Sequence, residues 1–113
     1  MCNCNYIAAR EIARIFRPMK KRGYSICRYE VNNEISVSLK KGEVEIEILV
    51  DSIPKTIEYL FRAPLRDVAL DCIGWLHEDL VVEYKTKSEA IHSMEKFSIA
   101  LQKNLAAIES AIK

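Results

Sequence analysis

Two consecutive stretches in the first half of the chain alternate between apolar and polar residues. The apolar members, on either side of a Lys41-Gly42 turn, are Ile35, Val37, Leu39, Val44, Ile46, Ile48 and Val50. Glutamate, serine and lysine fill most positions between them. A period of two residues is typical of an antiparallel strand with one buried face and one wet face. The sequence therefore predicts strands over 34–40 and 43–50, with an apolar face that other elements must cover.

A further strand is predicted over residues 24–31. Asn32-Asn33 separates it from the next strand, and asparagine tolerates the positive φ angles of a two-residue hairpin. Three strands joined by two hairpins make an antiparallel meander.

Helices are predicted at both ends of the chain. Residues 5–17 place apolar side chains on one helical face, and Pro18 ends that helix. The apolar residues are Ala8, Ile12, Ile15, Phe16 and Met19. At the other end, the sequence from Thr86 to Glu89 has the pattern of a capping box, which opens a helix that runs to the C-terminus.

The C-terminal helix carries a heptad seam whose residues are spaced alternately three and four apart. Its members are Ile91, Met94, Ser98, Leu101, Leu105, Ile108 and Ile112. Such a seam is used either within one chain, as core packing against another element, or between two chains at a subunit interface. The sequence leaves both uses open.

The middle of the chain is predicted to be helical. Ser52 caps a helix over 53–62, and a second helix covers 64–77 with a continuous apolar face. Residues 80–85 are rich enough in β-branched residues for a short strand and could equally extend the helix.

These elements predict a single α+β domain over residues 1–113. Its order is α-β-β-β-α-α-(β)-α, and the N- and C-terminal helices pack on one face of a three-stranded antiparallel meander. Half of the residues are apolar and 29% are charged, a balance typical of globular domains.

Basic residues cluster between residues 10 and 28. They are Arg10, Arg14, Arg17, Lys20, Lys21, Arg22 and Arg28. The only acidic residue between residues 10 and 28 is Glu11, although the whole chain has a net charge of +1. Three interpretations stand: a solvated helix face, a surface for an acidic protein, or a surface for nucleic-acid phosphates with Tyr24 and Tyr29 stacking on bases.

Trp75 is predicted to lie off the apolar face of the 64–77 helix, beside acidic residues. An exposed tryptophan is a candidate interaction hot spot. Together with the heptad seam, it predicts a protein partner, including a second copy of this chain.

Enzymatic motifs are absent from the sequence. His77 and His92 have no partner constellation, and the three glycines are scattered, so no phosphate-binding loop is predicted. Cys2 and Cys4 are separated by one residue, which is not a zinc-site spacing. We expect no catalysis, no metal, no cofactor and no small-molecule substrate.

The chain shows no secretory signal and no apolar run long enough to span a membrane, so a cytoplasmic location is expected. The expected function is a non-catalytic protein-interaction module, an oligomeric subunit or adaptor of a larger assembly. The alternative is a protein that binds RNA or DNA through its basic helix face.

Overall fold

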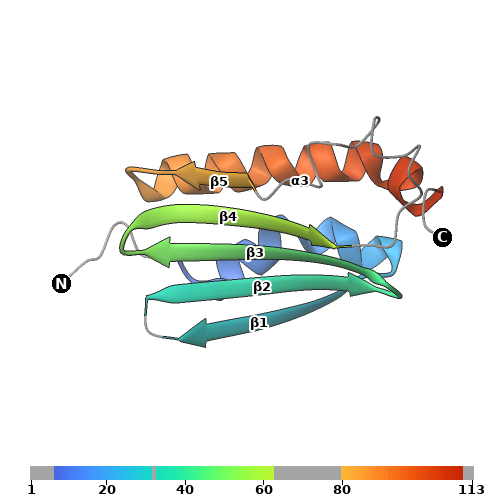
Figure 1. Cartoon of the computed structure of the whole chain (residues 1–113), viewed down its shortest axis with the longest axis horizontal. Helices are drawn as coiled ribbons and strands as arrows, with labels where there is room; N and C mark the ends of the chain where they lie inside the picture. Colours follow the sequence, from blue (N-terminus) through green and yellow to red (C-terminus); the bar gives the residue numbers. More distant parts are fainter. Residues whose placement is uncertain (1–6, 32, 63–79, 111–113) are drawn as a thin grey trace.

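The structure is a computed structural model that describes residues 7–31, 33–62 and 80–110. Five antiparallel strands form one sheet in the order β1-β2-β3-β4-β5, and both helices lie on the same face of it (Figure 1). In chain order the elements are α1 (Ala9–Ile15), the 3-10 helix η1 (Arg17–Arg22), β1 (Ser25–Val31), β2 (Glu34–Lys41), β3 (Val44–Ser52), β4 (Lys55–Arg62), β5 (Leu80–Glu83) and α3 (Lys87–Ser110). The predicted α+β class is confirmed, and the meander has two strands more than predicted.

The first three strands form as the alternation predicts. Val31 pairs with Glu34, and Lys41 pairs with Val44, so each connection is a two-residue hairpin. Gly42, in the second hairpin, has a φ of +59°, a conformation that glycine adopts without steric cost. Apart from Leu49, the apolar residues of β2 and β3 are buried on the helix-bearing face.

The helix predicted over 53–62 is wrong, because this segment forms β4. Ile57, Tyr59 and Phe61 alternate and are buried, while Leu60 lies on the opposite face of the sheet. The sequence fits both periods here, since Ile57, Leu60 and Phe61 also have helical spacing. Pairing of the whole length of β4 with β3 decides between the two periods, because it satisfies backbone groups of both strands.

Residues 80–83, which the sequence left open, are a strand. β5 pairs with β4, with Val82 opposite Ile57 and Val81 opposite Glu58. The helix predicted over 64–77, together with Trp75 and Cys72, lies outside the described residues.

The N-terminal helix is shorter than predicted. α1 ends at Ile15, ahead of Pro18, because proline has no backbone N–H and its ring clashes with the preceding turn. The chain continues as η1, with Pro18 near its start, and leaves it through Gly23 at a φ of +94°. Ile12, Phe16 and Met19 are fully buried beneath these two short helices.

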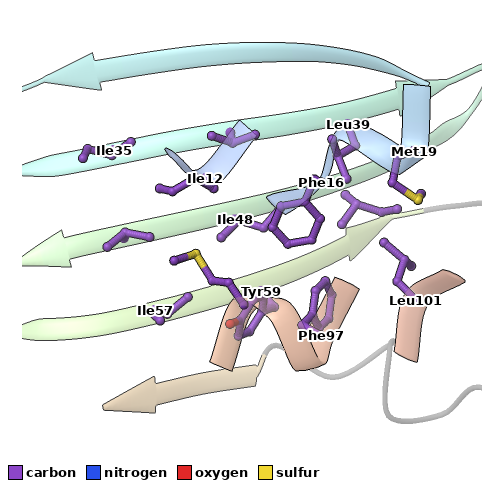
Figure 2. Close-up of a cluster of buried hydrophobic side chains, with 14 of the residues drawn as sticks. Ile12, Phe16, Met19, Ile35, Leu39, Ile48, Ile57, Tyr59, Phe97 and Leu101 are labelled. Atoms are coloured by element: carbon purple, nitrogen blue, oxygen red, sulfur yellow. The ribbon is translucent and has the colours of Figure 1, made fainter. Parts of the chain in front are cut away.

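The core fills the space between the sheet and the two helices (Figure 2). Phe97 of α3 stacks on Tyr59 of β4 with ring centroids 4.2 Å apart. Its ring also meets Phe16 edge-on at 6.2 Å. Three elements that are distant in sequence therefore meet at one aromatic cluster.

The heptad seam packs within the chain over the part that the structure describes. Met94, Leu101 and Leu105 are at most 1% exposed, and Ile91 is half-buried against the same core. At these positions the seam is therefore used as core packing within one chain. The side chain of Ile108 and the whole of Ile112 lie outside the described part.

Polar contacts also join the two helices. Lys87 of α3 forms a 2.9 Å ion pair with Glu11 of α1, and its hydrogen bond lowers the pKa of Glu11. Buried Ser98 donates a hydrogen bond to the carbonyl of Ile15 at 3.2 Å. At the start of α3, the Thr86 hydroxyl accepts a bond from the backbone N–H of Glu89, as the capping pattern predicted.

No helix in the described residues is both long and apolar enough to cross a membrane.

Burial of Tyr59 predicts a loss of stability at high pH. Desolvation raises the pKa of Tyr59 to about 12, against about 10 in an unfolded chain. Its contribution is complete below pH 10 and is lost as the pH rises toward 12, because the unfolded state releases the proton first. We expect urea unfolding at pH 9, 10 and 11 to show a decline that is shallower in Tyr59→Phe. Equal slopes for the two proteins would contradict this explanation.

Candidate anion-binding site

The basic residues of α1 lie on one side of the helix. Arg10 and Arg14 are four residues apart, and neighbours at this spacing lie one above the other on a helix. Both side chains are exposed, while Ile12 and Phe16 face the core. Burial of the apolar side therefore fixes the direction of the arginines.

The switch to a 3-10 helix extends this basic side. A 3-10 helix has three residues per turn, so residues three apart eclipse each other. Arg17 and Lys20 have this spacing in η1, and both are exposed. Pro18, which ends α1, thus also helps to align Lys20 with the arginines before it.

Arg28 reaches the same place from the sheet. It lies opposite Val37 in the register, and paired residues point to the same face, so Arg28 points to the face that carries the helices. β1 is an edge strand (Figure 1), which lets a charged side chain on this face remain exposed.

These five cations surround one hollow of about 300 Å³ between α1, η1 and β1, which we call the basic pocket. Its lining consists of Arg10, Ala13, Arg14, Arg17, Lys20, Ile26 and Arg28. None of the described residues in this lining is acidic. The small side chain of Ala13 leaves room between the arginines, and half-buried Ile26 contributes the apolar part of the wall.

Arg10 lies near enough to the Glu11 carboxylate to help Lys87 lower the pKa of that group, and Arg10 and Arg28 also line a neighbouring hollow with Glu30. The ion pairs in the described part of the chain involve other cations, namely Lys40, Lys41, Arg62 and Lys87. Like charges that converge repel one another, so an anion bound in the pocket reduces the repulsion among these five cations. Arginine forks can hold two oxygens of a phosphate or carboxylate at once.

The structure brings together five of the seven predicted basic residues. Lys21 and Arg22 do not line the basic pocket, although both are exposed. The backbone carbonyl of Arg22 accepts a 2.8 Å hydrogen bond from Lys41. Sequence reasoning missed Ala13 and Ile26. Ala13 could have been found from its spacing, since it lies three residues after Arg10 and four before Arg17.

The two tyrosines predicted to stack on bases have different environments. Tyr24 is 3% exposed, and its hydroxyl donates a hydrogen bond to Glu109 at 3.4 Å. Burial raises the pKa of Tyr24 to about 12, and Glu109 adds to the shift. The prediction that Tyr24 stacks on bases is therefore wrong, because its ring is buried. Tyr29, in contrast, is 67% exposed.

Among the described residues, no cysteine and no metal-ligating group lines the basic pocket. Cys27 lies in β1 and is exposed. No group of three or more His, Cys, Asp or Glu in residues 7–31, 33–62 and 80–110 is arranged to hold a metal ion. Cys2 and Cys4 fall outside these ranges.

Comparisons of this chain with protein-family models, with curated proteins and with solved structures give no match.

The convergence of five cations in the basic pocket predicts that multivalent anions stabilise the fold. Millimolar inorganic phosphate should raise the melting temperature by a few degrees over chloride at equal ionic strength, since it binds the folded state. Arg14→Ala with Arg17→Ala should abolish this rise. The matched control, Lys96→Ala with Lys103→Ala, removes two exposed cations of α3 that do not line the pocket. The explanation fails if both double variants respond to phosphate alike.

Proposed function

We propose that this chain is a non-catalytic binding module that holds the phosphate backbone of a nucleic acid in its basic pocket. The observation that carries the proposal is the convergence of five cations on one hollow whose described lining residues include no carboxylate. If the basic residues served only as a solvated helix face, they would not need to converge on one hollow. Arg28, which comes from the sheet, joins the α1 arginines only through the tertiary fold.

The charge distribution favours a ligand with several negative charges. The net charge of the whole chain is only +1, so the cations of the basic pocket are balanced by carboxylates elsewhere. The electrostatic attraction of an anionic ligand is therefore confined to the place where α1, η1 and β1 meet. A nucleic-acid backbone presents evenly spaced phosphates and releases bound counter-ions on contact, which adds favourable entropy.

Binding to oligonucleotides tests this proposal. We expect fluorescence anisotropy to detect binding at low salt, with log K falling by roughly 0.7–0.9 per phosphate contact per decade of salt. Replacing Arg10, Arg14 and Arg17 together by alanine should abolish binding without unfolding the protein, since alanine favours helix and these side chains are exposed.

The matched control replaces Lys85, Lys96 and Lys103 by alanine, which removes the same charge from exposed positions outside the basic pocket. This variant should keep most of the affinity. Absence of binding to all RNA and DNA, single- or double-stranded, at low salt refutes the proposal.

A second candidate function is a protein-interaction module that associates with its own copies. The face of the sheet without helices, here called the outer face, carries an excess of carboxylates. Its acidic residues are Glu34, Glu45, Glu47, Asp51, Glu58 and Glu83, against the cations Lys40 and Arg62. Half-buried Leu49 and Leu60 lie among them. The outer face of one copy therefore complements the basic pocket of another in charge.

The molar mass in solution tests the second candidate. We expect light scattering at low salt to give at least 26 kDa, twice the 13.0 kDa of one chain. Glu34→Gln with Asp51→Asn should lower this mass without loss of fold, because these carboxylates lie opposite each other and form no ion pair among the described residues. A monomer at tens of micromolar excludes this candidate.

A further inference from the structure

β1 is an open edge of the sheet, and almost the whole of it is exposed. It has seven residues, Ser25–Val31, of which only Ile26 is half-buried. Figure 1 shows β1 at one border of the sheet, at the opposite end of the strand order from β5. Proteins usually block an edge strand with a proline, a lysine, a bulge or a short length, because it is a template for pairing with another strand. β1 contains no proline or lysine, and it pairs with β2 residue by residue, without a bulge.

The register tells which residues of β1 turn their backbone toward this edge. The backbone N–H of Ser52 in β3 donates a hydrogen bond to the carbonyl of Asn33 at 2.9 Å. Successive residues of a strand bond to opposite sides, so the even-numbered residues of β2 bond to β1. Their partners in β1 are the odd-numbered residues. Ile26, Arg28 and Glu30 therefore direct their backbone groups to the open edge.

Arg28 and Glu30 give this edge opposite charges two residues apart. Both are exposed, and both lie on the helix-bearing face, because they pair with Val37 and Ile35. In an antiparallel pair of two β1 strands centred on Tyr29, each Arg28 lies opposite Glu30 of the second copy. Opposite charges in this arrangement stabilise a strand pair. A pair centred on residue 28 or on residue 30 places like charges opposite each other, which is destabilising.

The outer face of the same strand pair is apolar. Tyr29 and Val31 are 67% and 42% exposed, and both belong to the outer face. In the register centred on Tyr29, the two tyrosines lie opposite each other, and Cys27 lies opposite Val31 of the second copy. Aromatic pairs across neighbouring strands add stability. The carboxylates of the outer face begin only at β2, so none of them lies in this contact.

The hollow that Arg10 and Arg28 share with Glu30 leaves room for a second copy on the helix-bearing face. It has a volume of about 290 Å³, and its lining consists of Ala8, Ala9, Arg10, Arg28, Tyr29 and Glu30. The alanines near the start of α1 have small side chains, so the hollow has space for the Arg28 side chain of a second copy beside Glu30. Glu30 makes another contact within its own chain, but a carboxylate has about four sites for donors and can accept an arginine as well.

We propose that two copies of this chain pair through their β1 strands, antiparallel and centred on Tyr29. Two sheets of five strands then form one sheet of ten, with the helices of both copies on the same face. Main-chain hydrogen bonds supply the affinity of such a contact, and the side chains set its register. The contact is isologous and closes on itself, so it gives a dimer rather than a filament. This inference goes beyond the proposed function, and it differs from the second candidate, whose contact joins an outer face to a basic pocket.

Charge reversal on β1 tests this pairing. We expect light scattering to give about 26 kDa for the wild type, twice the 13.0 kDa of one chain. Glu30→Arg places two arginines opposite each other at two places in the contact, and it should raise the dissociation constant of the dimer at least about tenfold. Exchanging the two charges, with Arg28→Glu and Glu30→Arg together, recreates the opposite pairs and should restore the dimer.

Glu30→Arg also separates this contact from that of the second candidate. The variant adds a cation beside the basic pocket, so a contact between a basic pocket and an outer face would become tighter rather than weaker. The control is Glu34→Gln with Asp51→Asn, because it changes the outer face and leaves β1 intact. This control should keep the mass of the wild type if the β1 strands form the dimer.

Cross-linking tests the register. Residues 27 and 31 form a non-hydrogen-bonded pair in the proposed dimer, with Cα atoms about 4.5 Å apart, a separation at which a disulfide can form. With the other three cysteines replaced by alanine, Val31→Cys should give a covalent dimer on mild oxidation, seen on a non-reducing gel. Ser25→Cys in the same background is the control and should stay monomeric, because residue 25 lies opposite neither residue 25 nor residue 27 of the second copy. Melting curves check that each variant folds.

The outcomes decide the inference separately from the proposed function. A wild type that is monomeric at tens of micromolar overturns it. A dimer that Glu30→Arg does not weaken, or that the exchange of charges does not restore in folded protein, also overturns it. A covalent dimer from Ser25→Cys but not from Val31→Cys rejects the register centred on Tyr29. Glu30→Arg leaves the cations of the basic pocket in place, so none of these results bears on nucleic-acid binding.

Discussion

The contact of Phe97 with Phe16 and Tyr59 is the interaction on which the rest of the structure depends. It joins α3 to α1 and to the sheet, at centroid distances of 6.2 Å and 4.2 Å. α1 has only seven residues, too few to be stable alone, so its helical form depends on packing of this kind. The orientation of Arg10 and Arg14 follows, because they occupy the side of α1 opposite its buried residues.

A sheet covered on one face gives this chain two surfaces of different character. On the helix-bearing face, the edge at β1 remains open beside α1, and the cations gather there. The outer face carries most of its charge as carboxylates, which oppose edge-to-edge aggregation of an exposed sheet. Four of the five cations of the basic pocket come from α1 and η1, whereas the carboxylates of the outer face come from the alternation along the strands. The separation of charge within a chain of net charge +1 thus follows from the helices covering only one face.

Much of the fold could be predicted from the sequence, and the errors have physical reasons. β2 and β3 follow from their alternation, and α3 from its capping residues and seam. The segment 53–62 was mistaken for a helix because its apolar residues fit two periods, and only pairing with β3 distinguishes them. For the basic pocket, the sequence identified all five cations, but it did not separate them from Lys21 and Arg22 or exclude Tyr24 as a stacking residue.

The sequence by itself determined which faces are apolar and where basic charge is concentrated, because both are properties of residues close together in the chain. Only the tertiary structure decided that Arg28 joins the α1 arginines, since its direction depends on its pairing with Val37. The tertiary structure also buried Tyr24 beside Glu109 and left Tyr29 exposed. These outcomes depend on contacts between distant segments, and such contacts leave no local pattern in the sequence.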